Sequence, residues 1–102
     1  MEENKQRVFN SLFIQRRRMN LSQKHVARMI GQRDTTLLSR YESGRMMPSL
    51  ETAFRLSILY QTPLTRLFPE LHSRIVTEIV DHPRSKTVLR RRFYLDVVVE
   101  AA

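Results

Sequence analysis

Residues 21–48 read LSQKHVARMIGQRDTTLLSRYESGRMMP and contain the clearest helix and turn signals of the chain. Ser22 is a good helix N-cap, and the apolar residues after it recur at the three- and four-residue spacing of a helix face. Gly31 suits the left-handed conformation that ends many helices, and Asp34 is the capping candidate for the next helix. The stretch therefore predicts two short helices joined by a tight turn, with Ser43-Gly44 ending the second.

Further helices are expected on both sides of this stretch. A helix over residues 5–19 would end at Asn20, which tolerates the left-handed conformation. Ser49 would cap a fourth helix, and Pro63 would open a short fifth. The apolar residues expected to face the core, in chain order, are Val8, Phe9, Leu12, Phe13, Met19, Val26, Ala27, Ile30, Leu37, Leu38, Tyr41, Leu50, Ala53, Phe54, Leu56, Leu59, Leu64, Leu67 and Phe68.

The C-terminal part of the chain has a less regular pattern. Residues 69–82 have the apolar spacing of a helix, which Pro83 would stop. Residues 84–102 fit a helix or a strand, because their apolar residues allow both spacings and three consecutive valines favour a strand. A helix is slightly favoured, since a lone strand needs a partner. The apolar residues in question are Leu71, Ile75, Val76, Ile79, Val88, Leu89, Phe93, Leu95, Val97 and Val99.

The composition fits one small domain with a basic surface. The chain has 102 residues, with 18 Lys and Arg against 10 Asp and Glu, a formal net charge of +8. Such a charge favours polyanions, either nucleic acid or an anionic membrane, and arginine suits phosphates and guanine edges. No apolar run approaches the length of a membrane span, and the first residues lack the apolar region of a secretory signal. A cytoplasmic location without membrane binding is therefore expected.

The sequence does not indicate an enzyme. With no cysteine, disulfides, zinc fingers and thiol catalysis are excluded. The three histidines are scattered, without a carboxylate at metal-ligand spacing, and the two glycines do not form a phosphate-binding loop. We predict no catalytic residue, no metal site and no cofactor.

The motifs from Leu12 to Phe68 resemble, in their order and spacing, the lambda-repressor-like family of XRE-type helix-turn-helix proteins. The resemblance implies an all-α fold, with a five-helix DNA-binding domain over residues 5–69 and a C-terminal extension over 70–102. The motifs are Leu12 and Arg16, Leu21-Ser22-Gln23, Val26-Ala27, Gly31, Ser39-Arg40-Tyr41-Glu42-Ser43-Gly44-Arg45, Pro48-Ser49-Leu50-Glu51-Thr52, Leu64 and Leu67-Phe68.

Three positions depart from the family pattern. The turn from Gly31 to Asp34 is one residue longer than expected, which leaves the register of the third helix open by one position. Gln61 stands where the family usually has glycine, so the end of the fourth helix is in question. Ile58 stands where a polar residue is usual, which suggests that the chain after residue 69 covers this helix.

The resemblance implies which residues touch double-stranded DNA. Arg40 suits the O6 and N7 atoms of guanine, and threonine suits a base edge or a thymine methyl group. The expected base contacts are Thr35, Thr36, Ser39 and Arg40. The expected phosphate contacts are Gln23, Arg33 and Arg45. A structural ion pair is expected between Arg16 and Glu42.

The function that follows is that of a transcriptional regulator, a repressor that reads a two-fold DNA site as a homodimer. Residues 70–102 are the expected dimer surface. Two alternatives stay open. One is an antitoxin whose C-terminal extension binds a toxin, and the other is a protein-interaction module that does not bind DNA.

Overall fold

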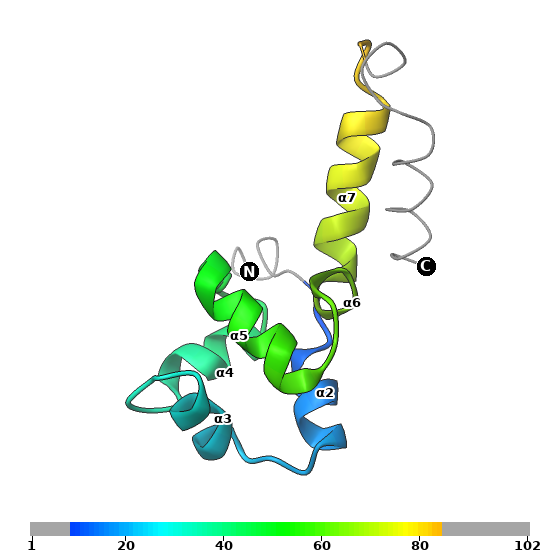
Figure 1. Ribbon diagram of the computed structural model, residues 1–102. Helices are drawn as coiled ribbons and strands as arrows, with labels where there is room; N and C mark the ends of the chain where they lie inside the picture. Colours follow the sequence, from blue (N-terminus) through cyan, green and yellow to red (C-terminus); the bar gives the residue numbers. More distant parts are fainter. Residues whose placement is uncertain (1–8, 85–102) are drawn as a thin grey trace.

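The computed structural model describes residues 9–84, and every regular element in this range is a helix (Figure 1). Five helices form a body: α2 (Leu12–Arg18), α3 (Gln23–Met29), α4 (Thr36–Glu42), α5 (Leu50–Tyr60) and α6 (Leu64–Leu67). A sixth, α7 (Pro69–Val80), projects away from the body. The predicted all-α fold with a C-terminal extension is confirmed. The choice of helix or strand after Arg84 lies outside the described residues.

Each helix of the body contributes one fully buried aliphatic side chain to a shared core. Helices of four to eleven residues are marginal in water on their own, so their stability comes from this packing. Burying one such side chain contributes about 1.5–3 kcal/mol. From α2 to α6 these side chains are Leu12, Val26, Leu38, Leu56 and Leu67.

The helix starts and the chain reversals follow the local sequence. The Ser22 hydroxyl accepts the N–H of His25, and the Ser49 hydroxyl accepts the N–H of Thr52, each at 3.1 Å. Gln61 adopts the left-handed conformation at φ 50°, in place of the glycine usual for the family. The other positive φ angles fall at Asn20, Gly31 and Gly44.

The first helix is shorter than predicted. It begins at Leu12 and not at residue 5, and the predicted segment 5–8, with Val8, lies outside the described residues. Asn10 explains where the helix begins, because its Oδ1 accepts the N–H of Leu12 at 3.0 Å. Its Nδ2 donates to the carbonyl of Tyr41 at 2.9 Å, which ties the incoming chain to the end of α4.

Several apolar residues predicted for the core lie on the surface. Short helices with neighbours on one side bury only a narrow stripe, and residues at the edge of the stripe stay in solvent. The residues of the helices and their ends that are concerned are 37–68% exposed: Phe13, Met19, Leu37, Leu50 and Phe54. Phe9, which is 61% exposed, precedes α2 and so belongs to no helix face. The prediction that the chain after residue 69 covers Ile58 is also wrong for the described part, since Ile58 is 76% exposed.

Candidate nucleic-acid interface

Helix α4 turns a polar face to solvent. Thr36, Ser39 and Arg40 are exposed, and their spacing places them on one side of the helix. On the other side, Leu38 and Tyr41 are buried in the core. The helix therefore presents hydroxyl groups and a guanidinium outward from a fixed position.

The start of α4 differs from the prediction by one residue. Asp34 was the expected N-cap, but Thr35 occupies that position, half-buried, and the helix begins at Thr36. The Asp34 Oδ1 atom accepts the N–H of Thr36 at 2.9 Å. This backbone hydrogen bond, with a second from the Thr36 side chain, lowers the pKa of Asp34. The additional turn residue is thus absorbed before the helix, and the carboxylate still satisfies a free N–H group.

Behind α4, Arg16 and Glu42 form a buried ion pair with two hydrogen bonds. The Arg16 Nε atom lies 2.6 Å from Glu42 Oε2, and Nη2 lies 3.1 Å from Oε1. The two side chains are 9% and 6% exposed. The hydrogen bond that Arg16 donates to Glu42 raises the pKa of Arg16, and this outweighs the lowering by burial, so the guanidinium stays charged. A third bond runs from Nη1 to the carbonyl of Leu21, at 3.0 Å, and links the pair to the turn before α3.

Gln23 joins this network, which its sequence position did not indicate. Its Nε2 donates to Glu42 Oε1 at 3.0 Å, and the side chain is half-buried. An amide nitrogen carries two hydrogens, so the second remains for another acceptor. The phosphate contact of Gln23 stays a prediction.

Basic side chains surround a hollow between α3 and the start of α4. Ala27 is almost fully buried here, and a larger side chain would push the two helices apart. The hollow has a volume of about 210 Å³, and its lining residues are Lys24, Ala27, Arg28, Arg33, Asp34 and Thr35. Three cations thus lie around the start of the exposed helix. Arg33 belongs to this group and precedes α4 in the sequence. Arg45 follows the C-terminal end of α4 and is exposed.

The turn between α3 and α4 is held from α5 by Arg55. The Arg55 Nη1 atom donates to the carbonyl of Ile30 at 3.1 Å, and Nη2 donates to Glu51 at 2.7 Å. Gly31 packs against the same guanidinium. A Cβ added at Gly31 would lie only 3.2 Å from Nη1, so a larger residue would displace the Arg55 side chain. Sequence reasoning missed Arg55, and the only available signal was its four-residue spacing from Glu51.

The described residues form neither a metal site nor a membrane-spanning helix. Within 9–84, no cluster of three His, Cys, Asp or Glu side chains has the arrangement to hold a metal ion. No helix in that range combines the length and the apolar character needed to cross a bilayer. The surface that stands out is the polar face of α4 with its basic surroundings.

Comparison with known proteins gives one match. Residues 13–67, more than half of the chain, match a family model described as Helix-turn-helix. Searches of curated proteins and of solved structures found no match. The matched range runs from α2 to the end of α6 and contains the whole polar face of α4. The chain belongs to the helix-turn-helix family of the XRE, lambda-repressor-like type, a family of DNA-binding regulators.

Proposed function

We propose that this protein is a cytoplasmic transcriptional repressor that binds a two-fold site in duplex DNA as a homodimer. The observation that carries the proposal is the exposed polar face of α4, fixed from behind by the core and by the Arg16–Glu42 pair. A helix held in this way fits the major groove, where every base pair presents its own pattern of donors and acceptors. Repression then needs no chemistry, since a bound protein blocks polymerase.

In this proposal, four residues at the start and along the outer face of α4 read base edges. Arg40 forms two hydrogen bonds with a guanine, and the threonine methyl groups pack against thymine methyl groups. The four residues are Thr35, Thr36, Ser39 and Arg40.

Phosphate contacts come from the flanks of the helix and set its position on the duplex. Arg33 approaches one strand from the hollow between α3 and α4, with Lys24 and Arg28 adding positive charge. Gln23 donates to a phosphate the second N–H of its side-chain amide, which the bond to Glu42 does not use. Arg45, beyond the end of α4, contacts a phosphate of the DNA backbone. Residues 5–69 form the DNA-binding unit, and residues 70–102 pair the two chains.

Selection of bound sequences from random duplexes tests the proposal. We expect an enriched two-fold sequence with half-sites about one helical turn, roughly 34 Å, apart. Changing Arg40 to Ala should weaken binding to the selected site by about 1–3 kcal/mol and relax the preference at one position of each half-site.

Arg66→Ala is the matched control, because it removes the same charge from an exposed position on α6. It should leave the base preference unchanged. If no sequence is enriched, or if Arg40→Ala selects the same sequence with the same affinity, the assignment of α4 to the groove is wrong.

A further inference from the structure

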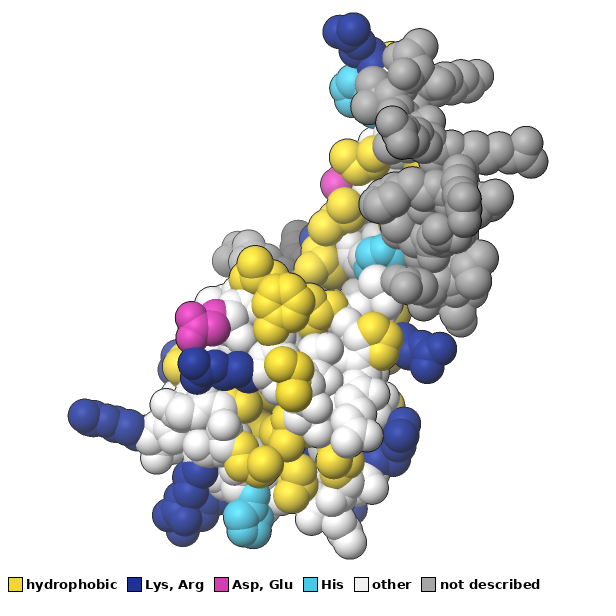
Figure 2. Space-filling model, in the orientation of Figure 1, with side chains coloured by type: hydrophobic (Ala, Val, Ile, Leu, Met, Phe, Trp, Pro, Cys, Tyr) yellow, Lys and Arg dark blue, Asp and Glu magenta, His cyan; other side chains and the backbone are white. Residues whose placement is uncertain are grey.

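Helix α7 carries an apolar row that the rest of the described chain leaves largely uncovered. None of its twelve residues is buried. Leu71 is half-buried, while Ile75 and Ile79 are 46% and 51% exposed. Their four-residue spacing places them on one side of the helix. Figure 2 shows apolar side chains continuing from α7 down onto the body.

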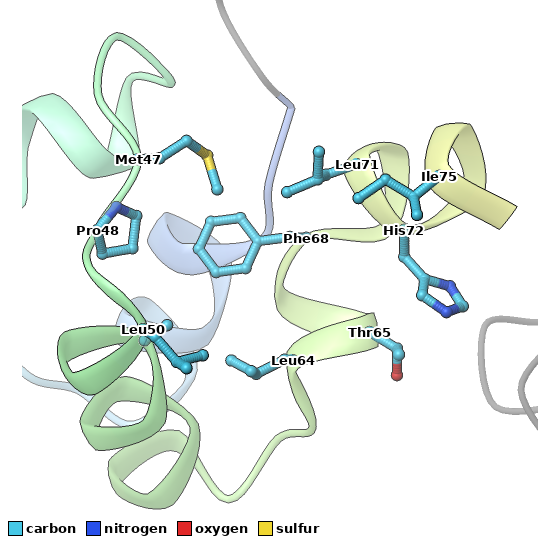
Figure 3. A pocket seen from close by; sticks show the side chains of 10 residues that line it. Met47, Pro48, Leu50, Leu64, Thr65, Phe68, Leu71, His72 and Ile75 are labelled. Atoms are coloured by element: carbon cyan, nitrogen blue, oxygen red, sulfur yellow. The ribbon is translucent and has the colours of Figure 1, made fainter. Parts of the chain in front are cut away.

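The row ends, at the foot of α7, in an apolar groove of about 350 Å³ (Figure 3). Leu71 and Ile75 of α7 form one wall, and Met47 and Leu50, before and at the start of α5, face them across the ring of Phe68. Leu50 and Met47 are themselves exposed. The groove and the row together make one continuous surface suited to an apolar partner.

The distribution of charge favours a second copy of the chain as that partner. Residues 9–68 contain ten Lys and Arg against three Asp and Glu, a net charge of +7, whereas residues 69–84 contain two against three, a net charge of −1. Two copies repel each other strongly across their bodies and only weakly along α7. Contact through α7 also leaves the basic body available for DNA.

The apolar row is complementary to itself. Its three members are spaced equally about Ile75, so two antiparallel α7 helices related by a two-fold axis bring Ile75 against Ile75. The same axis brings Leu71 of each copy against Ile79 of the other, at the mouth of the groove. Such an interface uses the same patch on both chains.

The charges beside the row fit the same arrangement. Arg74 and Glu78 are exposed and lie on the same flank of the row. In an antiparallel two-fold pair, equal flanks face each other. Arg74 of one copy and Glu78 of the other then differ by about 3 Å along the helix axis, from the rise of 1.5 Å per residue, and the two Arg74 side chains are separated by the same axial distance. The contact between Arg74 and Glu78 occurs twice and joins opposite charges, whereas the approach of Arg74 to Arg74 occurs once, so attraction prevails.

We propose that α7 pairs antiparallel with α7 of a second copy, with Ile79 of each chain seated at the groove of the other. This inference deepens the homodimer of the proposed function and rests on it. Its distinguishing consequence is that Arg74 of each chain meets Glu78 of the other.

Charge reversal at these two positions tests the pairing by sedimentation velocity without DNA. The wild-type chain should dimerise as its concentration rises. Arg74→Glu and Glu78→Arg each place like charges in both contacts, so each should raise the dissociation constant by roughly tenfold or more. An equimolar mixture of the two variants restores both opposite-charge contacts and should lower the dissociation constant to the wild-type value or below it.

Arg18→Glu, an equal charge reversal at an exposed position on α2, is the control and should leave dimerisation unchanged. Circular dichroism checks that all variants are folded. The proposal is overturned if the wild type stays monomeric, if single variants dimerise as the wild type does, or if the mixture gains nothing. A monomer that binds its DNA site would refute this pairing and the homodimer but not the DNA binding, whereas a rescued dimer without DNA binding would refute only the DNA-binding proposal.

Discussion

The body of the protein and α7 use the same sequence pattern with opposite results. Both have apolar residues at three- and four-residue spacing, yet every helix of the body buries at least one side chain fully and α7 buries none. They also differ in charge, strongly basic in residues 9–68 and slightly acidic in residues 69–84. The spacing thus predicts a helix and its apolar face, but not whether that face finds its partner within the same chain.

The largest expected effect concerns what holds the body together. Glu42→Ala should lower the free energy of unfolding by about 3–5 kcal/mol, because it leaves Arg16 as a buried charge without its carboxylate. Gln23 loses an acceptor in the same variant. Chemical denaturation measures the change.

Glu70→Ala is the matched control for this comparison. It removes the same side chain from an exposed position in the first turn of α7, outside the proposed contacts between the two chains, where we expect a change within about 1 kcal/mol. Equal stabilities of the two variants would mean that the ion pair does not stabilise the body more than a surface carboxylate stabilises α7.

The features that the sequence predicted are the local ones, namely where helices begin and where the chain turns. Ser22, Gly31 and Ser49 act within a few residues of themselves, through a cap or a positive φ angle, so neighbouring residues were enough to identify them. The Arg16–Glu42 pair joins positions 26 residues apart and was inferred from family resemblance.

What the sequence did not predict depends on the packing of distant segments. The bond from Gln23 to Glu42 and the bond from Arg55 to Ile30 span 19 and 25 residues. The exposure of Leu50 and Phe54 depends on which side of α5 packs against the other helices. Apolar residues occur on several sides of α5, so its sequence alone does not identify the buried side. The N-cap of α4 is Thr35 and not Asp34 because of the way in which the longer turn folds. The spacing of apolar residues in the sequence does not determine that conformation.

A smaller effect, on the salt dependence of DNA binding, tests the difference in charge between the body and α7. Arg33→Ala should weaken binding to all DNA sequences alike, since it removes one phosphate contact. The slope of log affinity against log salt concentration should become shallower by about 0.9. Arg84→Ala, the same change beyond the end of α7, should leave the slope as it is. Equal changes in slope would show that DNA contact is not confined to the body.

The smallest expected effect is the loss of stability at low pH through protonation of Asp34 at the start of α4. Comparison with Asp34→Asn distinguishes the contribution of the negative charge from that of the acceptor oxygen. Hydrogen bonds from Thr36 lower the pKa of Asp34 in the folded protein, so the folded state binds this proton less readily than the unfolded chain. The resulting stabilisation is present above the ordinary aspartate pKa, about 3.9, and is lost as the pH falls through the lowered folded value. Asp34→Asn keeps an acceptor oxygen and removes the charge.

The stability difference between the wild type and Asp34→Asn should therefore be present at neutral pH and shrink below about pH 4. The Asp34 carboxyl resonance, followed by NMR in the wild type, should titrate below the ordinary aspartate value, and the Thr36 amide resonance should move with it. A midpoint at or above that value would mean that the carboxylate does not hold the first N–H of α4. The position of α4 would then depend on its buried side chains, Leu38 and Tyr41, and on the Arg16–Glu42 pair, and not on the Asp34 carboxylate. The body would still fix α4 in place, a constraint that α7 lacks, but the first turn would contribute nothing to it.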